Sequence, residues 1–165
     1  MERRKLLEIA GAGVAAALLN QGEQAQAAVP SGAEALKLLA APCGLYCGAC
    51  GEYVNGKCHG CPCPCGQCAG AKYAAGCEVV KCVRGRKIES CADCPELPCT
   101  RIIQMANDPV WGTGSLNVEN LRRRKRLGTD AWLAEQKQYW SDTKKRDRWI
   151  ARARECMDRA QKYYK

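Results

Sequence analysis

One stretch of this chain, residues 43–99, holds thirteen of the fourteen cysteines at short spacings. A module of this size rarely folds around a small apolar core unless disulfides or bound metal ions add stability. Its large apolar side chains number only ten: Leu45, Tyr46, Tyr53, Val54, Tyr73, Val79, Val80, Val83, Ile88 and Leu97. The way in which the cysteines are joined therefore decides what this chain folds into and what it does.

The cysteines of this stretch fall into groups with the spacing of metal ligands. A Cys-x-x-Cys pair, such as Cys91 and Cys94, lets a single backbone turn present two thiolates to one metal ion. Pro62 and Pro64 restrict the backbone and remove N–H donors, so we expect a metal-binding loop around them rather than a helix or strand. The candidate metal ligands are Cys43, Cys47, Cys50, Cys58, Cys61, Cys68, Cys77, Cys82, Cys91, Cys94 and Cys99.

Three further side chains of the same loop are additional candidates. The Cys-Pro-Cys-Pro-Cys run offers more sulfur atoms than one tetrahedral zinc ion uses, so Cys63 and Cys65 are expected to bridge two metals or to be spare. His59 flanks the pair formed by Cys58 and Cys61, where a solvated loop histidine is the interpretation that we favour over a ligand.

The order of these motifs resembles a known family. The residues that carry the resemblance are Cys43-Gly44-Leu45-x-Cys47-x-x-Cys50, Cys58-x-Gly60-Cys61, the Cys77 and Cys82 pair, and Cys91-x-x-Cys94 leading into Pro98-Cys99. Over residues 42–103 the chain is similar to the bacterial and archaeal cysteine-rich family called domain of unknown function 3795, which is thought to bind zinc. The resemblance implies metal ligation by all the candidate ligands above except Cys68, and it brings no known reaction. The chain departs from the family in a short spacer after Cys50 and in the extra Cys63 and Cys65.

The first 27 residues are typical of an export signal and are set aside from the fold. Arg3 and Arg4 precede a weakly apolar run, residues 9–19. That run is too short to cross a bilayer, which takes about 20 residues. A small-x-small motif predicts cleavage after Ala27. The arginine pair resembles a twin-arginine signal; an ordinary secretory signal and an uncleaved anchor are the alternatives.

This signal predicts an exported protein, periplasmic or extracellular, whose partner is the twin-arginine export machinery. That machinery moves folded proteins, so the thiols would take up metal in the reducing cytoplasm before the chain meets an oxidising compartment. We expect no stable membrane span in the mature form, and we expect no nucleic-acid partner for an exported protein.

The excess of basic charge lies in the C-terminal third. The whole chain has a net charge of +9, and residues 100–165 carry sixteen basic and eight acidic groups. The densest run is residues 122–126. We expect a solvated helix face there, partly paired with Glu119. Docking of the run against an anionic cysteine module is the second interpretation, and contact with nucleic acid is the third.

Helical spacing and capping residues predict four helices in the C-terminal third. The first spans residues 98–107, with Ile103 among the residues that face inward, and the second ends at Gly128. The predicted caps of the last three are Asn117, Thr129 and Ser141. On the last helix, Cys156 is expected to be a buried thiol rather than a metal ligand.

Together these features predict a mainly α-helical protein with irregular metal-stapled loops and little or no sheet. We expect an export signal over residues 1–27 and a linker with a short helix over residues 28–41. A small cysteine-rich, metal-binding module follows over residues 42–103, and a basic helical region covers residues 104–165.

The predicted function is that of an exported metal-binding protein with a biological role still to be found. Two or three zinc ions, each held by four thiolates, would fold the module. Closed four-thiolate sites leave no position open for water, and the sequence has no Ser-His-Asp set and no phosphate-binding loop. The sequence therefore gives no support for an enzyme.

Four alternatives use the same cysteines. They could hold an iron–sulfur cluster for electron transfer, store Cu(I), or form a disulfide framework, although the odd number of cysteines in residues 43–99, thirteen, argues against complete pairing within that stretch. The spacing Cys43-x-x-x-Cys47-x-x-Cys50 also matches the three-cysteine motif of radical-SAM enzymes. The rest of the chain is too short for the barrel that those enzymes need.

Overall fold

A computed structural model of the chain describes residues 31–63, 76–110 and 112–163. The predicted export signal, with Arg3, Arg4 and the cleavage site after Ala27, lies outside the described residues. The candidate ligands Cys65 and Cys68 lie outside them as well.

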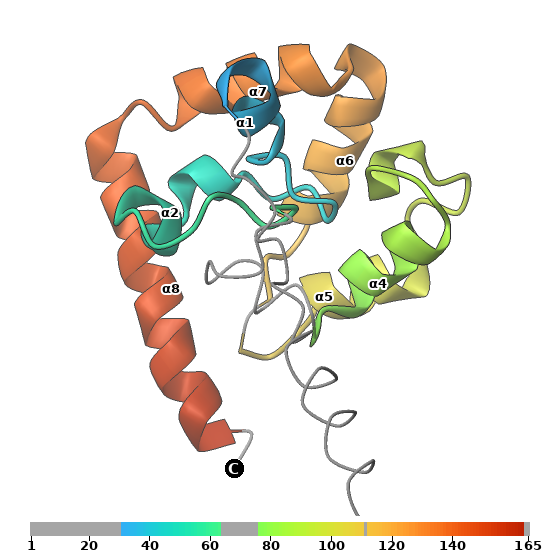
Figure 1. The fold of residues 1–165 in the computed structure, drawn as a ribbon. Helices are drawn as coiled ribbons and strands as arrows, with labels where there is room; N and C mark the ends of the chain where they lie inside the picture. Colours follow the sequence, from blue (N-terminus) through green and yellow to red (C-terminus); the bar gives the residue numbers. More distant parts are fainter. Residues whose placement is uncertain (1–30, 64–75, 111, 164–165) are drawn as a thin grey trace, which may run out of the picture.

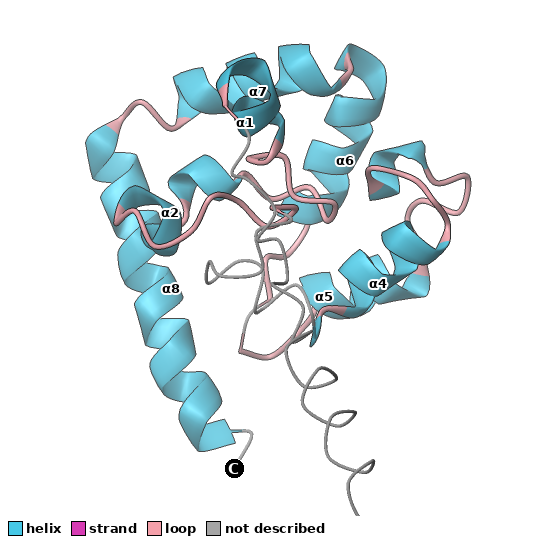
Figure 2. Cartoon of the chain, in the orientation of Figure 1, coloured by secondary structure: helices cyan, strands magenta, loops and turns pink. Residues whose placement is uncertain are grey.

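The described part of the chain is helical, as the sequence predicts, and contains no β-strand (Figure 2). Its one extended pairing within those residues is an isolated bridge between Ala40 and Tyr46. In chain order, the α-helices and 3-10 turns (η) are α1 (Gly32–Lys37), η1 (Cys47–Ala49), α2 (Gly51–Val54), α4 (Glu78–Gly85), η2 (Cys91–Asp93), α5 (Thr100–Ala106), α6 (Leu116–Leu127), α7 (Thr129–Tyr139) and α8 (Thr143–Tyr163).

The three C-terminal helices form a frame around the cysteine-bearing loops (Figure 1). Helix α7 lies against α1, and α6 lies against both η2 and α5. Helix α8 runs down the opposite side of the frame and contacts η1. Because α4 packs on α5, the cysteines between Cys77 and Cys99 lie together on the α5 side of the frame.

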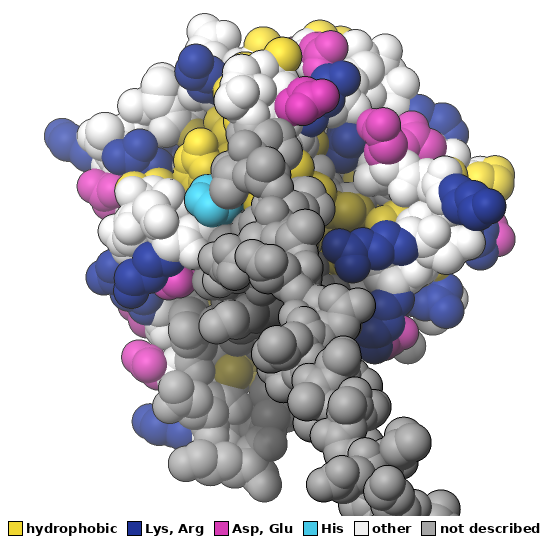
Figure 3. Space-filling view, in the orientation of Figure 1, with side chains coloured by type: hydrophobic (Ala, Val, Ile, Leu, Met, Phe, Trp, Pro, Cys, Tyr) yellow, Lys and Arg dark blue, Asp and Glu magenta, His cyan; other side chains and the backbone are white. Residues whose placement is uncertain are grey.

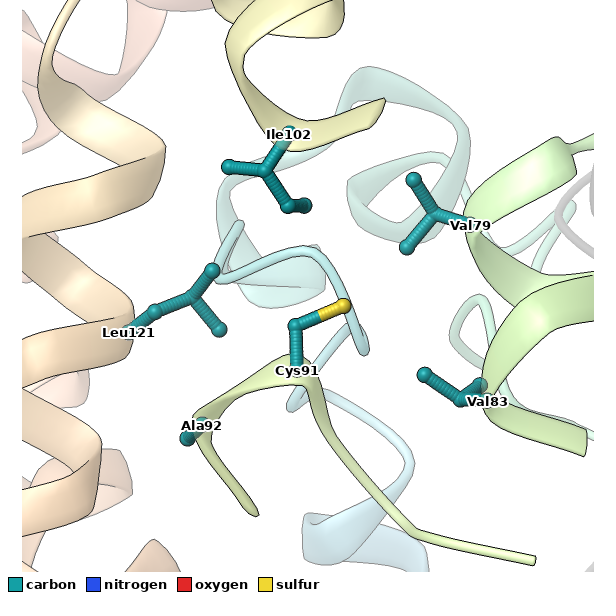
Figure 4. Close-up of a cluster of buried hydrophobic side chains, with 6 residues drawn as sticks. All are labelled: Val79, Val83, Cys91, Ala92, Ile102 and Leu121. Carbon is teal, nitrogen blue, oxygen red and sulfur yellow. The ribbon is translucent and has the colours of Figure 1, made fainter. Parts of the chain in front are cut away.

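One cluster of buried side chains lies where α4, η2, α5 and α6 meet (Figure 4). Helix α6 contributes Leu121 and α5 contributes Ile102, and neither side chain has any exposed surface. The other members are Val79, Val83, Cys91 and Ala92. The cluster is small, as the scarcity of large apolar residues predicts, and it joins the cysteine-rich stretch to α6.

A second cluster links the segment before the first cysteines to α7. Its buried members are Leu39, Ala40, Trp132 and Leu133. Tyr46 packs edge-on against Trp132, with 6.5 Å between the ring centroids. Aromatic pairs of this geometry add about 0.5–1.5 kcal/mol beyond the burial of their surfaces, so α7 helps to fix the turn that precedes η1.

The basic run on α6 has one buried member, which was not expected. The side chains of Arg122, Arg123, Lys125 and Arg126 are exposed, as predicted. Figure 3 shows Lys and Arg side chains in separate patches over one face of the molecule, with acidic side chains among them. However, Arg124 is only 4% exposed. The pairing predicted with Glu119 is replaced by an ion pair across helices, in which Arg123 Nη2 donates to Glu135 of α7 at 2.7 Å.

Arg124 joins three segments of the chain. Its Nε donates to Thr129 Oγ1 at 3.0 Å, and its Nη1 donates to the Ala41 carbonyl at 3.4 Å. The guanidinium also lies over the Trp132 ring, 5.7 Å from the centroid. Burial lowers the pKa of Arg124 from its usual value. The residue has a structural role at the junction of α6 and α7 rather than a place on the solvated face.

The helix ends differ from the predictions in detail. Helix α6 does end before Gly128, whose φ of +80° suits glycine, but it begins at Leu116, so Asn117 lies inside it rather than capping it. Ile103 of α5 is 41% exposed and does not face inward. For α8, the backbone N–H of Lys145 donates to Asp142 Oδ1 at 3.1 Å, which places the cap one residue later than predicted.

None of the described helices combines the length and the apolar character that crossing a bilayer requires.

Candidate metal centre

Two cavities of the described structure are lined by cysteines. The first is a hollow of about 10 Å³ between α4, η2 and α5, and the second is a cavity of about 350 Å³ next to η1 and α8. We call the first set of cysteines the α4–α5 group: Cys82, Cys91, Cys94 and Cys99. We call the second set the η1 group: Cys43, Cys47, Cys50 and Cys61.

The α4–α5 group is built from local structure. Cys91 opens the η2 turn and Cys94 follows it, so the Cys-x-x-Cys spacing presents two thiols from one turn, as predicted. The turn is held by Ser90, whose Oγ accepts a hydrogen bond from the backbone N–H of Ala92 at 3.1 Å. Helix α4 supplies Cys82, and the N-cap position of α5 supplies Cys99.

Two arginines donate hydrogen bonds to sulfur atoms of the α4–α5 group. Arg86 Nη1 lies 3.7 Å from Cys94 Sγ, and Arg101 Nη1 lies 3.8 Å from Cys82 Sγ. Arg86 also pairs with Glu96 at 2.9 Å. A cation that donates to a thiol favours its thiolate form. The two guanidinium groups therefore bring positive charge to the sulfur atoms of this group, which would offset the negative charge of metal-bound thiolates.

The η1 group depends on contacts from α6. Asn117 Nδ2 donates to the Cys43 carbonyl at 2.8 Å, and Asn120 Nδ2 donates to the Gly44 carbonyl at 2.9 Å. Gly44 has a φ of +88°, and a Cβ there would lie 2.8 Å from Leu121 Cγ. Only glycine fits so close to α6 with this backbone conformation. Steric hindrance therefore explains why glycine follows Cys43 in the motif.

Cys61 reaches the η1 group from a separate loop. Its backbone N–H donates to Cys47 Sγ at 3.3 Å. In the same loop, the N–H of Gly60 donates to Cys58 Sγ at 3.4 Å. Backbone donors of this kind orient thiolate ligands and tune the metal that they hold. The Cys58-x-Gly60-Cys61 motif thus places N–H donors on two sulfur atoms.

Burial raises the pKa of thiols in both groups. The pKa of Cys43 rises to about 12, chiefly because its thiol is removed from water, with smaller contributions to this rise from charges on Cys61, Cys77 and Cys91. Burial likewise raises the pKa of Cys91 to about 12 and that of Cys61 to about 11. These thiols are therefore protonated at neutral pH unless a cation arrives, and metal binding would release their protons.

Cys77 lies between the two groups. It occupies the N-cap position of α4 and packs against the buried cluster. A charge on Cys77 would raise the pKa of both Cys43 and Cys91, so its thiol is near a member of each group. The two groups are therefore neighbours rather than independent sites.

The loop before residue 64 brings the remaining described candidates together. Cys58 and Cys63 are buried, and His59 is half-buried. His59 Nδ1 lies 3.9 Å from Cys63 Sγ. His59 is therefore half-buried beside a sulfur atom, whereas we favoured a solvated loop histidine.

Cys156 also lines the large cavity, although the sequence spacing did not place it near the other cysteines. It lies on α8, is 5% exposed and lines the same cavity as the η1 group. Arg159 Nη2 donates to its sulfur at 3.2 Å. The prediction of a buried thiol is confirmed. Only the contact of α8 with η1, which is tertiary, brings it near the other cysteines.

The thiols are close together but do not converge. Across the described residues, no group of three or more His, Cys, Asp or Glu side chains is positioned to hold a metal ion as the chain stands. Binding would require the thiols of a group to turn toward a common centre. The members of both groups, together with Cys77 and Cys156, are free thiols.

Comparisons with protein-family models, with curated proteins and with solved structures give no match to this chain. The fold and the cavities define a helical, cysteine-rich protein with two clusters of thiols.

Proposed function

We propose that this chain is a metal-binding protein in which zinc, held by cysteine thiolates, stabilises the fold. The α4–α5 group carries the proposal. Four cysteines from three elements surround a hollow of about 10 Å³, and two arginines donate to their sulfur atoms. Four thiolates are a standard ligand set for structural zinc.

The size of the hollow suits a single ion. A cavity of about 10–15 Å³ admits about one sphere of the size of a water molecule. Zinc is held by direct bonds to sulfur of about 2.3 Å. Four thiolates around Zn²⁺ have a net charge of −2, which Arg86 and Arg101 would partly offset. With all four positions taken by sulfur, such a zinc has no place for a reactive water, so its role is structural.

The energetic argument compares zinc with the buried cluster. The four large aliphatic members of that cluster are Val79, Val83, Ile102 and Leu121. Burial contributes about 1.5–3 kcal/mol for each such side chain, or about 6–12 kcal/mol together. A structural zinc supplies about 10–16 kcal/mol of apparent binding energy. One ion would therefore contribute as much as the whole cluster around it.

The motif resemblance supports the same function. The cysteine pattern is similar to that of the family called domain of unknown function 3795, which is thought to bind zinc, and all four members of the α4–α5 group belong to that pattern. We place further metal, beyond the zinc of the α4–α5 group, at the η1 group and its neighbours.

Export is the second part of the proposal. The N-terminal pattern supports transport by the twin-arginine machinery to the periplasm or the exterior. Replacing both Arg3 and Arg4 by Lys should leave the protein in the cytoplasm with its leader uncleaved, as cell fractionation and the mass of the chain would show. Efficient export of that variant would contradict the route, and it would leave the metal proposal untouched.

The deciding experiment is elemental analysis of protein purified without added metal. We expect at least one zinc ion per chain that Cys94→Ser removes and that Cys156→Ser, a matched change of a buried thiol outside the α4–α5 group, does not. Removal of zinc by a chelator should unfold the chain, measured by circular dichroism. A metal-free protein that unfolds cooperatively would refute the proposal.

A further inference from the structure

The cavity beside the η1 group is far larger than one ion needs. It measures about 350 Å³, against about 10 Å³ for the hollow of the α4–α5 group. A volume of 300–1,000 Å³ is the range of sites that hold a cofactor or small molecule. The two cysteine groups are therefore shaped for occupants of different size.

The lining of this cavity has two chemical parts. Four thiols lie on the side formed by the η1 group, and α8 adds the thiol of Cys156. Most of the remaining wall is apolar, with Met105, Leu116, Trp140 and Trp149 among its residues, and Arg152 supplies a cation. Thiols suit soft metals such as zinc, Cu(I) and iron–sulfur clusters. The apolar wall would limit the access of water to such a centre.

The cysteines of the η1 group line the wall of a cavity of about 350 Å³. Cys43, Cys47 and Cys50 come from one short stretch, in which the η1 turn separates the last two. Cys61 joins them from another loop through its N–H bond to Cys47 Sγ. A single zinc needs four sulfur atoms around one centre. In a cuboidal cluster each thiolate binds a separate iron atom, so the ligands lie apart around the cluster.

We infer that the η1 group binds a [4Fe–4S] cluster, with Cys43, Cys47, Cys50 and Cys61 each ligating one iron atom. The inference rests on the thiolate metal binding proposed above and names the occupant of the second cysteine group. An oxidised cluster with four thiolates has a net charge of −2, which Arg152 and the N–H donor on Cys47 would offset. The protein would thus hold one zinc and one cluster side by side, with Cys77 between them.

The test is anaerobic reconstitution of the full-length protein with sulfide and equal amounts of ferrous and ferric iron as probes, which together have the oxidation state of the oxidised cluster. We expect about four iron and about four sulfide ions per chain, a broad visible absorption and about one zinc. These quantities are measured on the wild-type chain, so they do not depend on the folding of a variant.

Two matched variants locate the metals. Cys61→Ser should lower the iron and sulfide content several-fold and leave zinc unchanged. Cys94→Ser should remove zinc and leave the visible absorption of any folded protein in place. If wild-type protein takes up only zinc when iron and sulfide are offered, the cluster is refuted and the zinc proposal stands. If it binds iron and sulfide but no zinc, the zinc proposal fails and the cluster stands. A chain that binds neither metal refutes both.

Discussion

The α4–α5 group and the η1 group gather cysteine sulfur in two different settings. The first takes its four cysteines from residues 82–99, and its positive charges come from Arg86 and Arg101 close by in sequence. The second needs α6 to hold its backbone and α8 to complete its cavity. A thiol cluster can therefore be organised by local spacing or by distant packing, and the two should respond differently to the same perturbation.

The largest expected difference concerns stability. Cys94→Ser removes one ligand of the proposed zinc, whose binding is worth about 10–16 kcal/mol, so we expect the loss of cooperative unfolding. Cys50→Ser changes an exposed member of the η1 group and should leave the core of α4, α5 and α6 folded. Thermal unfolding followed by circular dichroism compares them. Equal losses would show that the two groups do not differ in this respect.

The buried cluster offers a way to affect both groups at once. Leu121 has no exposed surface and contacts the region of Gly44 as well as the cluster around Cys91. Leu121→Ala should cost about 2–5 kcal/mol in unfolding free energy. Leu127→Ala, at a 40% exposed position of the same helix, is the control and should stay within about 0.5 kcal/mol. A similarly small loss of unfolding free energy in both variants would show that Leu121 is not part of the core that stabilises the fold.

A hydrogen bond from α6 should matter to the η1 group alone. Asn117→Ala leaves the buried Cys43 carbonyl without its donor, at a cost of about 1–3 kcal/mol. The metal content of the η1 group should fall, while zinc at the α4–α5 group should remain. Asn107→Ala, at an exposed position, is the control. Loss of both metals in parallel would mean that the groups are not separable.

The arginine donors give a matched test on the other side of the comparison. Arg86→Gln removes the donor to Cys94 and should weaken zinc binding about 10–100-fold. Glu96→Gln breaks the exposed ion pair but keeps that donor, so zinc affinity should change little. Competition with a chelating dye measures both. The η1 group should keep its metal in either variant.

The last expected effect is confined to alkaline solution, and it is a pH dependence of the metal-free η1 group. The pKa of Cys43 is about 12 in the folded chain, against a usual value of 9.0. The folded state therefore keeps a proton that the unfolded state releases as the pH rises above 9. The stability that this proton contributes is fully present below pH 9 and is lost on the way to pH 12. The melting temperature of protein that holds zinc at the α4–α5 group but no metal at the η1 group should fall accordingly, with no such fall when the η1 group is loaded.

Local spacing predicted the helical class and the two-ligand turn of Cys91 and Cys94, because both depend on neighbours in sequence. It could not predict that Arg124, in the middle of a charged run, is buried against Trp132. Nor could it place Asn117 on the Cys43 carbonyl. These contacts join residues far apart in the chain. For the same reason, the sequence spacing identified the cysteines of the η1 group as a motif but could not predict the cavity that they line or the presence of Cys156 in its wall.

The bond between Asn117 and Cys43 spans 74 positions. At a translation rate of about 5–20 residues per second, the ribosome makes Asn117 about 4–15 seconds after Cys43. All four cysteines of the α4–α5 group are present as soon as Cys99 has emerged. The η1 group cannot form its hydrogen bonds with α6 until α6 has been made. During this period its thiols lack those contacts and are more open to reaction.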